Sequence, residues 1–280
     1  MRNERVGVFG LGIMGEALAA NLQTDGRLVV SWNRSRKESS PCFEHDIIKA
    51  TEKSDILLIT VSNAAAVSDV LKAMAPALGK DKIVVNCATV SPDENLALSR
   101  RATATGAAFC EALMGGSKLA AVNRKLPFYL GGDKNIIDHV LPVLEPLSSV
   151  CLHVGDIGTA SVAKLAMNLN LAMQLEALCE SYAYARTNGL SDDQYFNVFR
   201  NNTGWNYLCE YKEPKLRSRD YAPQFSVRNM LKDIRLALQT DHTVNGLKLL
   251  KETEAIYSRG ESQGLGEEDM IALLKLIQPD

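Results

Sequence analysis

The chain has no long hydrophobic segment and no strong excess of charge of either sign. None of its apolar runs reaches the roughly 18 residues that a helix needs to span a bilayer. Lys and Arg together number 31 and Asp and Glu together number 33, so the formal net charge is -2. A surface that binds nucleic acid or anionic lipid generally needs a basic excess, so we expect neither as a partner.

Paired metal-ligand and disulfide motifs are also lacking. The four histidines are isolated, no GxSxG sequence occurs, and we expect no metal site and no Ser-His-Asp triad. The six cysteines form no CxxC pair and lie far apart in the sequence: Cys42, Cys87, Cys110, Cys151, Cys179 and Cys209. Free buried thiols in a cytoplasmic protein are the expectation. Residues 1–5 lead into a strand-like segment without a cleavable signal pattern.

The first half of the chain alternates strand-like and helical segments. Helical spacing is found over residues 15–22 and 64–78. Short apolar or β-branched runs predict strands at residues 6–9, 28–32, 55–61 and 82–86. Strands that alternate with helices predict a parallel sheet with right-handed crossovers.

The second half is helical in pattern and has few strand signals. A segment rich in Ala, Leu and Met runs without Pro or Gly from Ser161 to Asn188 and ends at Gly189, a helix stop. Further helices are predicted at residues 192–200, 226–241, 247–263 and 267–276. We therefore expect an α/β fold, with a Rossmann-type doubly wound sheet at residues 1–158 and an all-helical domain at residues 159–280. The long helix would connect them.

A GxGxxG sequence follows the first predicted strand and precedes the first predicted helix. It reads Gly10-Leu11-Gly12-Ile13-Met14-Gly15. In this context the first glycine permits a tight turn, the second lets the backbone approach a pyrophosphate, and the third lets helix and strand pack closely. The sequence therefore predicts a dinucleotide site that includes Gly10, Gly12, Ile13, Met14 and Gly15.

The end of the second predicted strand indicates which dinucleotide is bound. An NAD site usually has an acidic residue there, which accepts from the ribose 2′-OH. Here Asn33, Arg34, Ser35 and Arg36 follow the strand, and no acid occurs before Glu38. Arginine side chains and nearby amide and hydroxyl groups suit a 2′-phosphate, so we expect NADP(H) as the cofactor.

Several ordered motifs resemble the β-hydroxyacid dehydrogenase family, close to its glyoxylate/succinic semialdehyde reductase branch. The resemblance runs over nearly the whole chain. It rests on GLGIMG followed by WNRS, on Thr89-Val90-Ser91-Pro92, and on the segment from Glu111 to Lys118. It also rests on Gly155-Asp156-Ile157-Gly158 with Lys164 and Asn168, and on Phe225 to Asp233, which ends in Lys-Asp.

The resemblance implies site residues on both halves of the chain. Lys164 would be the acid/base that exchanges a proton with the substrate oxygen, and burial would lower its pKa toward a useful range. Asn168, four residues on along the same helix face, would orient the substrate. Further cofactor contacts would come from Val61, Ser62, Asn63 and Thr89, and Lys232 would lie near both cofactor and substrate. From the sequence alone, Lys164, Asn168 and Lys232 equally suit a solvated helix face.

The substrate loop departs from the family pattern. Where relatives commonly have Pro-Val-Ser-Gly, this chain has Leu113-Met114-Gly115-Gly116, with Ser117 following. The glycines can still form an anion-binding nest, but the hydroxyl at position 115 is missing. The resemblance implies substrate contacts at Met114, Gly115, Gly116 and Ser117, and at Trp205 and Tyr207, although plain packing explains the two aromatic residues equally well.

We therefore expect an NADP(H)-dependent oxidoreductase that acts on a small-molecule substrate. The substrate would be an aldehyde or keto acid such as glyoxylate, succinic semialdehyde or a related 3-oxo acid. One alternative is an imine reductase, whose members usually lack Lys at position 164, and another is a dinucleotide-binding scaffold without turnover. The resemblance and the apolar helical half favour a homodimer or homotetramer, with the active site in a cleft between the domains.

Overall fold

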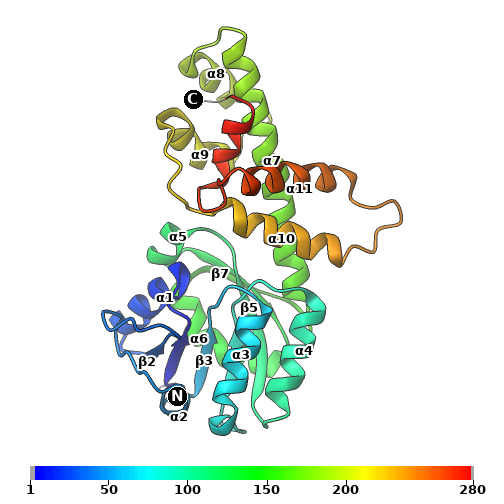
Figure 1. Cartoon of the computed structure of the whole chain (residues 1–280). Helices are drawn as coiled ribbons and strands as arrows, with labels where there is room; N and C mark the ends of the chain where they lie inside the picture. Colours follow the sequence, from blue (N-terminus) through cyan, green and yellow to red (C-terminus); the bar gives the residue numbers. More distant parts are fainter. Residues whose placement is uncertain (1–3, 279–280) are drawn as a thin grey trace. The chain divides into compact units, whose positions relative to one another are not determined.

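The computed structural model describes residues 4–278, and the chain divides into two compact units after Lys164 (Figure 1). The first unit is a sheet covered by helices, and the second is built of helices alone. A doubly wound α/β domain followed by a helical domain is the fold that the sequence predicted, and the structure confirms it. The expected domain limits at residues 1 and 280 lie outside the described residues.

The sheet of the first unit has seven strands in the order β2-β1-β3-β4-β5-β6-β7. The strands are β1 (Val6–Phe9), β2 (Leu28–Trp32), β3 (Ile56–Ile59), β4 (Ile83–Asn86), β5 (Ala108–Met114), β6 (Leu126–Gly131) and β7 (Ser148–Gly155). All neighbours pair in parallel except β5 and β6, which are antiparallel. The parallel sheet expected from the first four strands is confirmed. The later pair β5 and β6 is antiparallel because the segment between them is too short for a full crossover around a long helix.

Helices cover both faces of this sheet (Figure 1). One face carries α1 (Ile13–Thr24), α5 (Lys118–Val122) and α6 (Lys134–Leu144), whose buried residues form one hydrophobic cluster with the sheet. The other carries α2 (Ile47–Lys53), α3 (Ala64–Met74) and α4 (Pro92–Thr103), which contribute to a second cluster. Short 3₁₀ turns η1 (Ala75–Ala77) and η2 (Glu145–Leu147) follow α3 and α6.

The long helix α7 (Thr159–Thr187) begins in the first unit and continues into the second. The second unit adds α8 (Asp192–Arg200), α9 (Tyr207–Ser218), α10 (Val227–Gln239), α11 (Lys248–Ser262) and the 3₁₀ helix η3 (Met270–Leu276). The helix predicted over residues 267–276 is present from Met270, as a 3₁₀ helix rather than an α-helix. Helix α9 was not predicted, because Pro214 lies inside it and lysines interrupt its apolar pattern.

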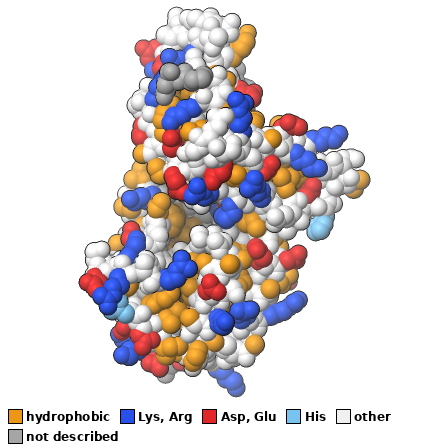
Figure 2. All heavy atoms as spheres, viewed as in Figure 1, with side chains coloured by type: hydrophobic (Ala, Val, Ile, Leu, Met, Phe, Trp, Pro, Cys, Tyr) orange, Lys and Arg blue, Asp and Glu red, His pale blue; other side chains and the backbone are white. Residues whose placement is uncertain are grey.

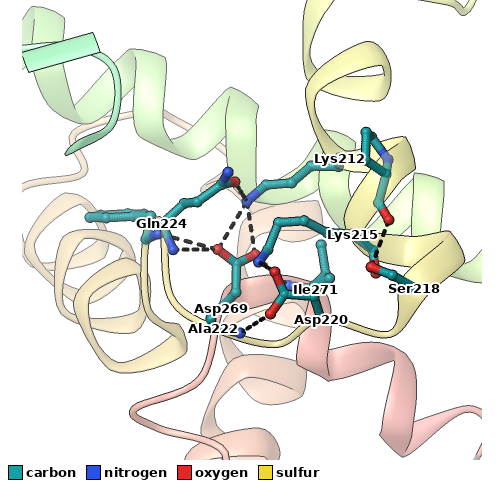
Figure 3. Close-up of polar contacts among 10 residues, drawn as sticks. Lys212, Lys215, Ser218, Asp220, Ala222, Gln224, Asp269 and Ile271 are labelled. Atoms are coloured by element: carbon teal, nitrogen blue, oxygen red, sulfur yellow. Dashed lines mark hydrogen bonds and ion pairs between the residues drawn. The ribbon is translucent and has the colours of Figure 1, made fainter. Parts of the chain in front are cut away.

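A buried ion pair ties α9 to η3 inside the helical unit (Figure 3). The Nζ atom of Lys212 lies 2.8 Å from Oδ1 of Asp269, and both side chains are almost completely buried. Lys212 also donates to Oε1 of Gln224, while Asp269 accepts from the backbone N–H groups of Gln224 and Ile271. Burial lowers the pKa of Lys212, and the contacts to Asp269 oppose that shift.

The surface is mixed in charge: Figure 2 shows basic and acidic side chains interspersed over the viewed face. No helix within residues 4–278 is long and apolar enough to cross a membrane. Over the same residues, no cluster of three or more His, Cys, Asp or Glu side chains is placed to hold a metal ion. The six cysteines are free thiols, and four of them are buried as expected. The expectation of burial is wrong for Cys42, which is exposed in a surface turn, and for Cys151, which is half-buried.

Candidate active site

The glycine-rich turn between β1 and α1 has the backbone geometry that its sequence predicted. Gly10 has a φ of +106°, a conformation that side chains other than glycine rarely adopt. The hydroxyl of Thr60 donates to the Gly10 carbonyl oxygen at 2.5 Å and holds the turn against β3. A Cβ atom at Gly15 would lie 1.9 Å from the same oxygen, so helix and turn pack at a distance that only glycine permits.

Gly12 differs from the other two glycines because nothing lies near it. A Cβ atom built at Gly12 would meet no heavy atom within 4 Å, and no side chain caps α1 at this residue. The first N–H groups of α1 therefore face an open approach, where backbone donors and the helix dipole favour an anion. This opening fits the pyrophosphate of a dinucleotide lying over Gly12, Ile13 and Met14.

Asn33 joins this turn to the loop after β2. Its Oδ1 accepts from the backbone N–H of Leu11 at 2.9 Å, and its Nδ2 donates to the backbone oxygen and the hydroxyl of Ser35. The side chain of Asn33 thus fixes the two loops relative to each other. Arg34 and Ser35 are exposed beside it. Lys37 ties the same loop to α1 through the Leu11 carbonyl oxygen and Glu16.

The neighbouring strands end at the same edge of the sheet. Because β1, β3 and β4 are parallel, their carboxyl ends lie side by side, where open α/β sheets bind ligands. Ser62 and Asn63 follow β3 and are exposed, and Val61 is half-buried. Asn63 caps α3 by accepting from the N–H of Ala66 at 2.9 Å. Thr89 follows β4 and is half-buried.

The loop after β5 is shaped by two residues of β6. The N–H of Gly115 donates to the Pro127 carbonyl oxygen at 2.8 Å. A Cβ atom at Gly115 would lie 2.7 Å from Cγ of Pro127 and 3.4 Å from the hydroxyl of Tyr129. The serine side chain of the family pattern therefore has no room here. Gly116 has a φ of +86°, while Met114 and Ser117 are half-buried.

The predicted acid/base lies near the start of α7. Lys164 is half-buried in the first unit, and Asn168 follows one helical turn later, in the second unit. Residues four apart on a helix share a face, so the two side chains leave α7 in similar directions. Asn168 is 5% exposed.

In the second unit, Asp233 connects two of the predicted site residues. Its Oδ2 accepts from Nδ2 of Asn168 at 2.6 Å, and its Oδ1 lies 2.6 Å from Nζ of Lys232. Asp233 itself is 2% exposed. The sequence motif contained this residue, but no sequence signal gave it a role, because its contact with Asn168 joins helices 65 positions apart.

Of the two aromatic residues that follow Gly204, Trp205 packs within the helical unit and Tyr207 lies mostly exposed. The ring of Trp205 makes an edge contact with Phe199, with centroids 5.5 Å apart, and the guanidinium of Arg200 lies over it. Tyr207 is 78% exposed and stacks on Tyr211. Their part in substrate binding stays a prediction.

Two family models match the chain over almost its full length. The first, described as the NAD binding domain of 6-phosphogluconate dehydrogenase, covers residues 5–155. The second, described as NAD-binding of NADP-dependent 3-hydroxyisobutyrate dehydrogenase, covers residues 158–277.

Individual relatives agree with these models. The chain is 25% identical to glyoxylate/succinic semialdehyde reductase 1 of Arabidopsis thaliana, over 98% of both chains. It superposes on the 3-hydroxyisobutyrate dehydrogenase of Mycobacterium tuberculosis with L-serine at a TM-score of 0.87, with 22% identity, over 98% of this chain and 99% of the other. It also resembles Psf3 in complex with NADP+ and 2-OPP, with a TM-score of 0.90 and 22% identity, over 98% and 100% of the two chains.

The fold, the open glycine turn and these matches define an oxidoreductase that uses a nicotinamide dinucleotide and acts on a CH–OH group. The chain belongs to the β-hydroxyacid dehydrogenase family. The resemblance inferred from the sequence motifs is therefore confirmed.

Proposed function

We propose that this protein is an NADPH-dependent reductase of a small aldehyde or keto acid, with Lys164 as the acid/base. The observation that carries the proposal is the placement of Lys164 and Asn168 one turn apart on α7, with Asn168 held by the buried carboxylate of Asp233. A proton donor beside a fixed amide is what reduction of a carbonyl group requires from the protein.

The protein's share of the reaction is to hold the substrate and to supply a proton. When bound, NADPH supplies the hydride that becomes the new C–H bond. The ammonium of Lys164 gives its proton to the carbonyl oxygen, and the product is the hydroxy acid. In the reverse direction the neutral amine of Lys164 takes the hydroxyl proton. General acid–base help of this kind is worth roughly 10²- to 10⁴-fold in rate.

Asn168 orients the substrate through its amide oxygen. A carboxylate accepts hydrogen bonds and cannot donate, so the contact with Asp233 identifies the Asn168 atom at 2.6 Å as the NH₂ group. The oxygen of the amide is left to accept from the ammonium of Lys164 or from a substrate hydroxyl. Lys232, on the other side of Asp233, would contribute positive charge toward cofactor and substrate.

The cofactor preference follows from the loop after β2. Asn33 is engaged in holding the loop, and it leaves the exposed Arg34 and Ser35 as the groups that would bind a 2′-phosphate. No carboxylate of this loop precedes Glu38 to accept from a 2′-hydroxyl. The remaining cofactor contacts would come from Val61, Ser62, Asn63, Thr89 and Lys232. These features support NADPH over NADH.

The substrate class is proposed from the relatives and from the loop after β5. Glyoxylate and succinic semialdehyde stand in the name of one relative, and both carry a carboxylate. In glyoxylate it is attached directly to the reacting carbonyl, and in succinic semialdehyde methylene groups separate the two. Backbone N–H groups at Gly116 and Ser117 suit that carboxylate, since the N–H of Gly115 already donates to Pro127. Met114, Trp205 and Tyr207 would form apolar contacts. The Tyr129 hydroxyl, 3.4 Å from where a Cβ atom at Gly115 would be, would take the part of the absent serine hydroxyl. We also propose a homodimer or homotetramer in the cytoplasm, with the boundary between the two domains of the chain between residues 158 and 159.

The test follows NADPH absorbance with glyoxylate, succinic semialdehyde and other small aldehydes and keto acids. Lys164→Ala is compared with Lys72→Ala, which removes an exposed lysine from α3 as a matched control. We expect turnover with NADPH in the native and control proteins, and a loss of roughly 10²-fold or more in Lys164→Ala. Turnover that survives in Lys164→Ala would refute the acid/base role. NADPH binding without turnover on any carbonyl would favour a scaffold.

A further inference from the structure

A carboxylate is completely buried beneath the start of α7. Glu111 lies in the middle of β5 and is 0% exposed. Its Oε2 accepts from the backbone N–H of Gly158 at 2.6 Å. Its Oε1 accepts from the N–H of Ser161 at 3.2 Å and from the Ser161 hydroxyl at 2.7 Å. A buried charge is costly unless hydrogen bonds satisfy it, and here backbone and side-chain donors do so.

The contacts of Glu111 continue into the sheet. The amide of Asn95, on α4, donates to Glu111 and to the Ser161 hydroxyl, and the amide of Asn86, at the end of β4, donates to Asn95. All four side chains are 0% exposed. Gly131 of β6 pairs with Glu111 of β5, and a Cβ atom at Gly131 would lie 2.3 Å from Oε2 of Glu111. The absence of a side chain at Gly131 thus leaves the space in the sheet that the Glu111 carboxylate occupies.

The hydrogen bonds that Glu111 accepts fall on the first turn of α7, where they act as a helix cap. The helix begins at Thr159, so Gly158 is its N-cap and Ser161 its third residue. A carboxylate that accepts from the N–H groups at these two positions satisfies orphan donors of the first turn and complements the helix dipole. In most helices a local side chain plays this part; here it comes from a strand of the sheet. These hydrogen bonds therefore fix both the position of the first turn of α7 along its helix axis and its rotation about that axis, relative to β5.

Lys164 follows Ser161 by three residues and lies on the next turn of the same helix. We propose that Glu111 is a positioning residue for Lys164: by clamping Gly158 and Ser161, it sets where the lysine ammonium stands relative to the carboxyl edge of the sheet. This inference rests on the proposed acid/base role of Lys164. Displacing a reacting group by about 1 Å can cost on the order of 10²-fold in rate, so such a clamp affects catalysis without touching the substrate.

The experiment compares Glu111→Gln with Ser161→Ala in the full chain. Gln keeps the size of Glu but presents an NH₂ group toward donors, so one of the backbone contacts must break. Ala at position 161 removes the hydroxyl contact and leaves the backbone contacts of Glu111 in place. Asp46→Ala is the matched control, because Asp46 caps α2 in the same unit, and its loss destabilises the fold without a contact to α7.

Three quantities are measured: kcat and KM with NADPH and the best of glyoxylate and succinic semialdehyde, the pH dependence of kcat, and amide hydrogen exchange. For Glu111→Gln we expect kcat to fall roughly 10- to 100-fold, with KM for NADPH changed less than about threefold. The pH profile of kcat should shift, because Lys164 would stand in a changed position. Amide exchange should quicken at Gly158 and Ser161. Ser161→Ala should show the same pattern more weakly, and Asp46→Ala should keep the native kcat and pH profile.

The outcomes separate this inference from the proposed function. If Lys164→Ala loses turnover but Glu111→Gln and Ser161→Ala keep the native kcat and pH profile, the positioning role is wrong and the acid/base role stands. If Lys164→Ala keeps turnover, the acid/base role itself fails. Should Glu111→Gln not fold, Ser161→Ala decides alone. In the absence of turnover, unchanged exchange at Gly158 and Ser161 in both variants would overturn the clamp.

Discussion

The amide of Asn168 donates to the carboxylate of Asp233 at 2.6 Å, and this contact joins α7 to α10 within the helical unit. The same carboxylate lies 2.6 Å from the ammonium of Lys232. One buried acidic side chain therefore orients both residues that the second unit is expected to place near the substrate. Asp233 is a positioning residue in this arrangement.

The Asp233→Asn variant tests that arrangement. The new amide keeps one acceptor but loses the charge, so it cannot hold both Asn168 and Lys232 as the carboxylate does. We expect kcat to fall roughly 10- to 100-fold, with NADPH binding weakened less. Asp241→Asn is the control, because Asp241 lies in an exposed loop of the same unit and accepts from the N–H of Thr243. If Asp233→Asn is as active as Asp241→Asn, Asp233 has no positioning role in catalysis.

The Arg34→Ala variant tests the cofactor preference. If the exposed guanidinium of Arg34 binds the 2′-phosphate, its removal costs about 1.5–3 kcal/mol of charge-assisted hydrogen bonding. KM for NADPH should then rise roughly 10- to 100-fold, while KM for NADH stays close to its native value. Steady-state kinetics with both cofactors measure this. A parallel loss with NADPH and NADH would indicate that the loop is merely distorted, and the preference would need another cause.

Much of the fold was predictable because its signals are local. A short stretch of sequence is enough to predict each of three features: the buried strands β1 and β3, the GxGxxG turn, and the Pro-free helix α7. The antiparallel β6 was not predicted, since the strand direction depends on how the chain returns across β5, and no local pattern encodes that.

The candidate site residues stay predictions. Lys164 and Asn168 were proposed because their spacing resembles that of the family, and Gly12 because a GxGxxG between a strand and a helix is a specific context. Their supports, Glu111 and Asp233, could not be given roles from sequence, because each contacts a residue of α7 that lies about 50 or more positions away. Packing likewise explains Trp205, which the sequence left open between core and substrate contact.

The loop at Gly115 gives a steric prediction. Gly115→Ser restores the hydroxyl of the family pattern, but its Cβ atom would lie 2.7 Å from Pro127. Overpacking of this kind costs about 1–3 kcal/mol, so the variant should unfold at lower denaturant than the native protein. Pro127→Ala removes the obstructing ring, and the double variant should recover most of the loss. A Gly115→Ser protein as stable as the native chain would show that the loop moves freely.

The buried ion pair of the helical unit gives a stability prediction. Lys212→Met leaves Asp269 as an unpaired buried charge, and breaking such a pair typically costs about 3–5 kcal/mol. Arg235→Met breaks the exposed pair with Glu254 in the same unit and should cost less than about 1 kcal/mol. Urea unfolding of both variants tests the contrast. Similar midpoints would mean that the remaining hydrogen bonds to Asp269 suffice to hold η3.

A buried carboxyl group without a partner predicts that stability depends on pH. Glu176 lies on α7 in the helical unit, and neither of its carboxyl oxygens has a hydrogen-bond partner within residues 4–278. Burial raises its pKa to about 8, and the charge of Glu180 adds to this shift. Tyr257 from α11 and Cys179 from α7 lie near it; burial keeps the pKa of each well above its usual value, so neither is charged at neutral pH.

The direction of the pH effect follows from the protonation of Glu176 in the folded and the unfolded chain. Below pH 4.5 the carboxyl of Glu176 is protonated in both the folded and unfolded chains, so this group does not lower the stability there. As the pH rises toward 8, Glu176 ionises only in the unfolded chain, and the free energy of unfolding falls by at most about 4–5 kcal/mol.

Unfolding of a Trp32→Phe protein, followed through the fluorescence of Trp205, reports on the helical unit alone. We expect its urea midpoint to fall between pH 5 and pH 8, and this fall to be largely absent when Glu176→Gln is added, because the amide does not titrate. Glu180→Gln should leave a smaller fall, since the repulsion that raises the pKa of Glu176 is reduced. Identical pH profiles with and without Glu176→Gln would show that Glu176 does not titrate in this range.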